Sequence, residues 1–180
     1  MSTVTHESPQ DRPRFSVFIA TSLDGFIARS DGGIDWLAMV ETPSQDYGYP
    51  QFFASIDTLL VGRGTYDTAL GFPEWPYRHK RCLVLTHRPI TPRYDETAIA
   101  GEPCAIAREL YEAGARHVYV DGGATIRQFL AAGLVDSLTL SVVPILLGSG
   151  LRLFGPEQPE TRLQLKQVRD FPTGLVQLRY

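Results

Sequence analysis

Short apolar runs recur along the chain and are separated by longer amphipathic stretches. Runs of five to seven mostly apolar residues, bounded by polar residues, glycine or a turn, are typical of buried strands. They occupy residues 15–21, 58–62, 81–86 and 117–121, and a longer run covers residues 137–147. The pattern therefore predicts strands at these five places.

The stretches between these runs have a helical period. Residues 63–70, 102–115 and 124–133 follow strands or loops and carry apolar residues three or four positions apart. In the second stretch, Ile106, Leu110 and Ala113 fall on one helical face, and Gly133 closes the third. A further short helix is expected within residues 41–57, with Ser44 as a possible N-cap.

Turn signals complete the outline. Asp24-Gly25 predicts a turn into a short second strand, and the alternating tail around Pro172-Thr173-Gly174 predicts a hairpin. Strands alternating with helices indicate an α/β sheet covered on both faces. We expect one domain over residues 14–180, with a mostly parallel sheet and antiparallel C-terminal edge strands. Residues 1–13 are expected to form a disordered polar tail.

Composition narrows the classes of protein. The chain has 180 residues, 43% of them hydrophobic, and a net charge of −3. The basic residues are dispersed, which argues against a nucleic-acid partner, and no apolar stretch is long enough to span a membrane. Cys82 and Cys104 lack the spacing of a metal or redox site. We therefore expect a cytoplasmic protein with reduced thiols, no metal and a small-molecule substrate.

The ends of the predicted strands indicate where a ligand would bind. In α/β sheets ligands lie beyond the carboxyl ends of the strands. Ala20, Gly62, Thr86 and Gly122 stand at these ends and are expected along one rim. After Gly122, the residues Gly123, Ala124 and Thr125 open a helix whose free amides suit a phosphate. A plain tight turn is the alternative, and the spacing is not the GxGxxG of the usual dinucleotide motif.

Two neighbouring strand ends carry basic and hydroxyl side chains. Arg63 and Thr65 can clamp a phosphate, or can simply form a helix start with an exposed arginine. Thr86, His87 and Arg88 can hold a ribose 2′-phosphate, or can be an ordinary polar loop. Because two strand ends that could bind an anion are expected on one rim, phosphate binding is the favoured interpretation of both.

Carboxylates and aromatic residues gather in the first third of the chain. Asp46 fits the first turn of a helix, where the helix dipole favours a carboxylate. Aromatic side chains near it could line a pocket, although such clusters more often form core; they are Trp36, Tyr47, Tyr49 and Phe53. Burial against these rings would raise the pKa of Asp46 and suit it to donate a proton.

Four stretches together resemble one family. They are "FIATSLDGFIA", "LLVGRGTY", "CLVLTHRP" and the segment from "VYVDGGATIRQFL" to "GSGLRLF". In this order they resemble the dihydrofolate reductase superfamily, in particular the bacterial branch related to the riboflavin-biosynthesis reductase (RibD C-terminal) domain. The resemblance covers residues 14–180 and implies a dihydrofolate-reductase-like three-layer fold and a homodimer.

The resemblance also implies NADPH as cofactor. Ala20 and Ile27 match positions that hold the nicotinamide. Gly62, Arg63 and Thr65 match the residues that hold the adenosine phosphate and pyrophosphate. Thr86, His87 and Arg88 match the loop that binds the 2′-phosphate. Gly122, Gly123, Ala124 and Thr125 match the pyrophosphate loop. In this family the Gly–Gly bond of the pyrophosphate loop is often cis.

The catalytic acid and the substrate are less defined. Counting from Trp36 places the family's acid at Glu41, whereas counting back from Gly62 places it at Asp46, which we prefer. The riboflavin reductases have an Asp-Asn-Pro motif where this chain has "YDTALGFPEWPY". We therefore expect an NADPH-dependent oxidoreductase acting on a small pterin- or pyrimidine-like heterocycle. The alternative is a non-catalytic, nucleotide-binding dimeric interaction module.

Overall fold

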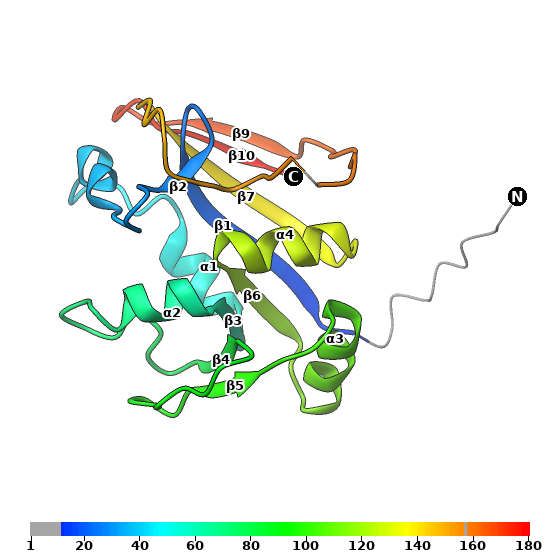
Figure 1. The fold of residues 1–180 in the computed structure, drawn as a ribbon. Helices are drawn as coiled ribbons and strands as arrows, with labels where there is room; N and C mark the ends of the chain where they lie inside the picture. The colour runs from blue at the N-terminus through cyan, green and yellow to red at the C-terminus, as the bar shows by residue number, and fades with distance from the viewer. Residues whose placement is uncertain (1–11, 157) are drawn as a thin grey trace, which may run out of the picture.

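An eight-stranded sheet forms the centre of the molecule (Figure 1). The computed structural model describes residues 12–156 and 158–180. The strands of this sheet are β1 (Arg14–Ser22), β3 (Thr58–Gly62), β4 (Arg81–Leu85), β5 (Thr97–Ile99), β6 (His117–Asp121), β7 (Val135–Val143), β9 (Gln167–Asp170) and β10 (Val176–Arg179). They lie in the order β5-β4-β3-β6-β1-β7-β10-β9. The predicted tail falls outside the described residues except for Arg12 and Pro13.

The directions of the strands confirm the predicted fold class. The neighbours from β5 to β7 are parallel, whereas β10 pairs antiparallel with both β7 and β9. The turn between β9 and β10 contains Gly174 with φ +84°, as the hairpin signal predicts. A two-stranded sheet of β2 (Phe26–Ala28) and β8 (Leu151–Arg152) stands apart from the central one.

Helices cover the sheet on both faces. They are the 3₁₀ helix η1 (Asp35–Val40), α1 (Tyr49–Ser55), α2 (Arg63–Ala69), α3 (Pro103–Glu112) and α4 (Gly123–Ala131). Successive side chains of a strand point to opposite faces. Leu60 and Val120 accordingly pack with α3 and α4, whereas Val61 and Tyr119 pack with the aromatic residues of α1 and α2. The result is the three-layer arrangement that the resemblance implies.

The helix predicted within residues 41–57 is present, but three local details differ from the predictions. This helix begins at Tyr49, because Tyr47 and Gly48 have φ values of +55° and +78°, and Ser44 is not its N-cap. The strand β7 ends at Val143, because Pro144 has no amide to continue the ladder. In α3 it is Ala107, not Ala113, that is buried beside Ile106 and Leu110.

The short edge strand β5 was not predicted, because its three residues carry too little pattern. None of the helices in the described part of the chain is long and apolar enough to cross a bilayer.

Asp24 does more than form a turn. Its carboxylate accepts hydrogen bonds from the Ser22 hydroxyl at 2.5 Å and from the amides of Leu147 at 3.1 Å and Gly148 at 2.7 Å. These contacts fasten the loop after β7 to the turn between β1 and β2. The Ser22 hydroxyl, with both amides, lowers the pKa of Asp24 to about 2.

The Asp24 contacts predict an acid-sensitive contribution to stability. Since the folded-state pKa lies below the ordinary 3.8, the contribution is complete above pH 4 and disappears as pH falls toward 2. Asp24→Ala is expected to lower the melting temperature at pH 7. Melting curves between pH 7 and pH 2 should show the wild type and the variant converging in acid. A difference that is constant with pH would contradict this role, and Asp31→Ala is the matched control.

Candidate functional site

Two strand–helix junctions interlock at the edge of the sheet. The junction of β3 with α2 contributes Gly62 and Thr65, and the junction of β6 with α4 contributes Gly122 and Thr125. A Cβ atom on Gly62 would lie 2.7 Å from Oγ1 of Thr125, and one on Gly122 would lie 2.5 Å from Oγ1 of Thr65. Each threonine thus occupies the space that the opposite glycine leaves free. The glycines are therefore needed for packing, whatever ligand binds there.

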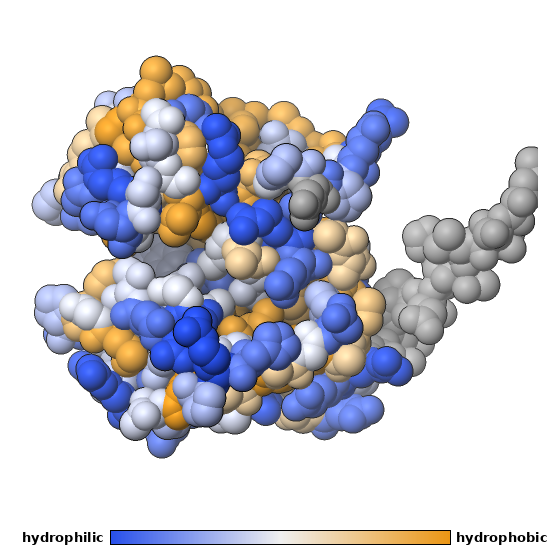
Figure 2. Space-filling view, viewed as in Figure 1, coloured by the Kyte–Doolittle hydropathy of each residue, from blue (hydrophilic) through white to orange (hydrophobic). Residues whose placement is uncertain are grey.

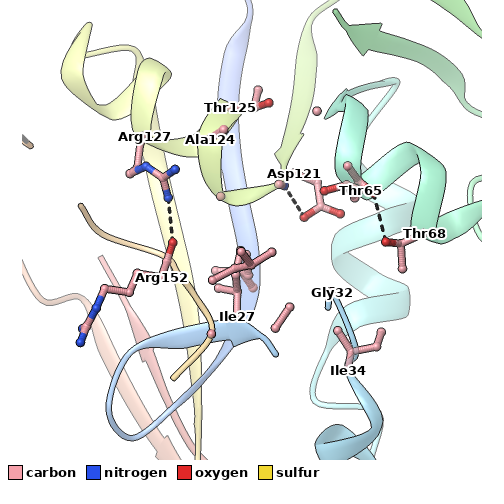
Figure 3. Close-up of a pocket in the computed structure, with 18 of the residues that line it drawn as sticks. Ile27, Gly32, Ile34, Thr65, Thr68, Asp121, Ala124, Thr125, Arg127 and Arg152 are labelled. Carbon is pink, nitrogen blue, oxygen red and sulfur yellow. Dashed lines mark hydrogen bonds between the residues drawn. The ribbon is translucent and has the colours of Figure 1, made fainter. Parts of the chain in front are cut away.

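The second glycine of the pair has a separate constraint. A Cβ on Gly123 would lie 2.7 Å from Cδ1 of Ile27 and 3.3 Å from the carbonyl oxygen of Arg152. The start of α4 therefore presses against β2 and β8 (Figure 3). Gly122 itself has φ +97°, which favours glycine. The bond between Gly122 and Gly123 is trans, so the cis bond that the resemblance suggests does not occur in this structure.

A large cleft opens beside these junctions. Its volume is about 1290 Å³, and the space-filling view shows it as the hollow between the two halves of the molecule (Figure 2). The carboxyl ends of β1, β3 and β6 form its base, and the first turn of α4 forms one side. Ile34, Leu37 and Phe72 add apolar surface. Pockets that hold drug-sized ligands are about 300–1,000 Å³, so this cleft exceeds the size needed for one such molecule.

Most of the residues expected around the cofactor line this cleft. They are Ala20, Ile27, Gly62, Arg63, Thr65, Gly122, Gly123, Ala124 and Thr125. Arg63 is held by Asp67, whose carboxylate accepts from Nε at 2.9 Å, and by the Pro89 carbonyl, which accepts from Nη1 at 3.1 Å. The guanidinium is therefore fixed at the wall of the cleft.

The loop with Thr86, His87 and Arg88 does not line the cleft. The Thr86 hydroxyl accepts from the amide of Arg88 at 3.1 Å, which turns the loop on itself, and the side chains of His87 and Arg88 are exposed. The loop reaches the site only at its end, where Pro89 contacts Arg63.

The predicted acids lie outside the cleft. Asp46 is exposed, and its Oδ1 accepts from the amide of Gly48 at 2.8 Å, which forms the turn before α1. Glu41 is exposed at the end of η1. The expected burial of Asp46 is wrong, because the left-handed residues at 47 and 48 delay the helix and leave the carboxylate on the surface.

The predicted aromatic pocket is part of the core instead. Trp36 is buried in a cluster with Val143 and Phe171. Tyr47 packs edge-on against Phe171, and its hydroxyl bonds to the Val40 carbonyl and to Thr173. Tyr49 and Phe53 join the aromatic cluster on the α1 face of the sheet. None of these four side chains lines the cleft: Trp36 is core, Tyr49 and Phe53 are half-buried against it, and Tyr47 also borders a second hollow.

Asp121 is the carboxylate that the strand ends place in the cleft, which Asp31 of the loop after β2 also lines. Asp121 ends β6, and its Oδ1 accepts from the Gly122 amide at 2.8 Å (Figure 3). Its Oδ2 accepts from the Tyr77 hydroxyl at 3.2 Å. Burial raises the pKa of Asp121 above the ordinary 3.8, and the bonds from Gly122 and Tyr77 only partly oppose this. Burial also raises the pKa of Tyr77, so its phenol stays protonated as a donor.

Sequence reasoning did not assign this role to Asp121, although the residue lies in the quoted glycine motif. A charged residue at the end of a buried strand, directly before a glycine pair, is the signal that could have identified it.

Opposite Asp121, the side of the cleft is held by Arg127 of α4. Its Nη1 donates to the carbonyl oxygens of Arg152 at 2.7 Å and Leu153 at 3.3 Å. These bonds tie α4 to β8 across the mouth of the cleft (Figure 3). The Arg152 guanidinium is itself held over the ring of Phe26, 4.5 Å from its centre.

Comparison with known proteins agrees with the family resemblance of the sequence. The family model described as the RibD C-terminal domain matches residues 78–177. The uncharacterized protein YwjB of Bacillus subtilis is 35% identical, over 91% of this chain and 95% of its own. The riboflavin biosynthesis protein RibD of Corynebacterium ammoniagenes is 30% identical over 78% of this chain, which spans 45% of that protein. The crystal structure of a putative riboflavin biosynthesis protein from Shewanella sp. PV-4 superposes with a TM-score of 0.86 at 35% identity, covering 93% of this chain and 97% of the other.

The interlocked junctions predict that Gly122→Ala is strongly destabilising. The added methyl would meet Thr65, and alanine would have to adopt φ +97°. We expect a loss of roughly 2–4 kcal/mol in the free energy of unfolding, measured by urea titration. Gly64→Ala is the control, because nothing lies within 4 Å of its added Cβ. If both variants have equal stability, the interlock does not constrain the fold.

Proposed function

The chain belongs to the RibD C-terminal domain family, and from this we propose that it is a reductase that transfers hydride from NADPH to a small heterocyclic molecule. The observation that carries the proposal is the cleft at the ends of the parallel strands. There the half-buried carboxylate of Asp121 lies beside a helix N-terminus and a glycine-lined wall within one cavity. A pterin-like or pyrimidine-like substrate is proposed from the family alone.

The residues of the cleft fit a dinucleotide. The first amides of α4, from Gly123 to Thr125, have no partner within the helix and would be available to bind the pyrophosphate of the cofactor. The Thr65 hydroxyl and the Arg63 guanidinium add donors on the opposite wall. Ala20 and Ile27 form the floor where the nicotinamide ring would lie. When bound, NADPH supplies the hydride.

The exposed loop of Thr86, His87 and Arg88 is proposed to bind the ribose 2′-phosphate. It stands outside the cleft, but its end contacts Arg63, which lies on the wall. A 2′-phosphate projecting from the adenosine end would meet this loop at the surface. The imidazole of His87 and the guanidinium of Arg88 are exposed there and free to turn toward it.

Asp121 is the proposed proton donor. Its raised pKa favours the protonated acid at the moment when the substrate receives hydride and needs a proton. The amide of Gly122 and the hydroxyl of Tyr77 hold the carboxyl in place and stabilise the carboxylate left after proton transfer. The apolar side chains of Ile34 and Leu37 exclude water from the same cavity.

A non-catalytic nucleotide-binding module is the second candidate. The observation that favours it is the surface position of Asp46, the residue expected to be the acid. The two candidates share the cofactor site and differ only in whether the cleft carries a working acid. A substitution at Asp121 therefore separates them.

Asp121→Asn is expected to lower kcat by about 10²–10⁴-fold, because an amide cannot supply the proton. The dissociation constant for NADPH, measured by fluorescence, should stay within a few-fold. In the wild type, kcat/KM should fall as pH rises through the pKa of Asp121, and this decrease should be absent from the variant. Assays would use a panel of pterins and aminopyrimidines.

Asp46→Asn is the matched control for Asp121 and should leave kcat unchanged. If wild type turns over none of the panel yet binds NADPH, the non-catalytic module is supported. If NADPH does not bind at millimolar concentration, both candidates fail.

Dimerisation is also proposed, through the edge of the sheet at β9. All four residues of β9 are exposed, and Leu163, Leu165 and Val168 are 44%, 50% and 55% exposed. An open strand edge beside exposed apolar side chains requires cover, and a second copy of the chain would supply it.

Light scattering should therefore give about twice the 20.0 kDa chain mass at micromolar concentration. The double change Leu165→Glu and Val168→Glu is expected to yield monomer, whereas Leu146→Glu, at a loop that is 69% exposed, should not. A monomeric wild type would refute this proposal.

A further inference from the structure

A grid of polar side chains covers one face of the sheet where no helix lies over it. On the other face, Val17, Leu138 and Leu140 pack in the core under α4. Alternate residues therefore point away from α4. The strand register places these outward-pointing residues of β1, β7, β10 and β9 side by side. They are Ser16, Ser137, Thr139, Ser141, Gln177, Arg179, Gln167 and Arg169.

A second hollow of about 550 Å³ is built on this grid. Its rim is completed by Arg14, by His117 and by the segment from Tyr47 to Ser55, which includes Gln51 and Phe52. The lining carries three arginines and one histidine. Among the described residues that line it, none is a carboxylate.

The floor of the hollow is fixed by a network of hydrogen bonds. Ser137 donates to Ser16 at 2.8 Å, and Ser16 lies 2.8 Å from Nε2 of His117, whose Nδ1 faces the Ser55 carbonyl at 2.9 Å. Gln177, only 6% exposed, donates to Ser141 and to the Tyr47 carbonyl at 3.1 Å each. Burial lowers the pKa of His117, so the positive charge of the hollow comes from the arginines.

The arginines of the hollow have no acidic partner of their own. The ion pairs found within the described ranges join Arg12 to Asp136, Arg29 to Asp35 and Arg63 to Asp67. Arg14, Arg169 and Arg179 take part in none of these. Arg169 is instead held over the ring of Phe171, 5.1 Å from its centre. Three uncompensated guanidinium groups in one concave site attract anions, and their planar donors match phosphate.

We propose that this hollow is a second binding site, separate from the cleft, for a small phosphorylated molecule. The arginines of β9, β10 and β1 would bind the phosphate groups, and Thr139 and Gln167 would add neutral donors from the grid. Phe18 lines both the hollow and the cleft, so the two sites share one wall. A second copy of the chain is a poorer occupant, because a two-fold axis over this face would bring like charges together.

The test is a titration of the full chain with inorganic pyrophosphate, followed by amide chemical shifts. Saturable shifts are expected at residues 139, 167 and 177, around the hollow. The double change Arg169→Gln and Arg179→Gln should weaken this binding at least ten-fold, and the single changes should each weaken it less. Arg108→Gln, an exposed arginine on α3, removes the same charge elsewhere and should have no effect.

Any of three results would overturn the proposal. One is a set of shifts confined to residues 122–125, which would place the pyrophosphate in the cleft alone. The others are equal affinity for wild type and the double variant, and no saturable shifts at all. Thermal unfolding of each variant checks that it is folded, and the single variants serve if the double variant is not.

Discussion

The cleft depends on the contact between two strand–helix junctions. Thr65 fills the space beside Gly122, and Thr125 fills the space beside Gly62. This reciprocal packing fixes the ends of β3 and β6 relative to each other, and with them the start of α4. Because α4 begins at this contact, its free amides, Asp121 and the wall that contains Arg63 all face one cavity. A methyl group at either glycine would force the two junctions apart.

The strict alternation of side chains along the strands assigns different roles to the two faces of the sheet. One face is apolar and is covered by α3 and α4. The other is apolar only near β3, β4 and β6, where α1 and α2 cover it, and becomes polar toward β9. Burying that polar part under a helix would require partners for every hydroxyl and guanidinium. The sheet therefore leaves it open, which produces the second hollow.

The two carboxylates show how surroundings decide the chemistry of a residue. Asp46 and Asp121 both precede a helix. Asp46 bonds a neighbouring amide at the surface, whereas Asp121 is enclosed by Tyr77, Gly122 and the ends of the strands. Desolvation raises the pKa of Asp121. The position of the family's catalytic acid was predicted by counting residues along the chain. The residues that line the cleft, however, come together through contacts between segments distant in sequence.

The residue pattern by itself determined the strands β1 to β4, β6 and β7, the helices α2 to α4 and the tail hairpin, because each has a local period or a turn signal. It also located the glycine junctions and the residues Arg63 and Thr65 on one rim, because parallel strands share a carboxyl edge. Only the tertiary structure decided that Trp36, Tyr47, Tyr49 and Phe53 pack in or against the core, that Asp121 lines the cleft and that the polar grid is open. Burial and electrostatic surroundings depend on contacts between segments that are far apart in sequence. No local pattern in the sequence indicates which of these segments will come into contact.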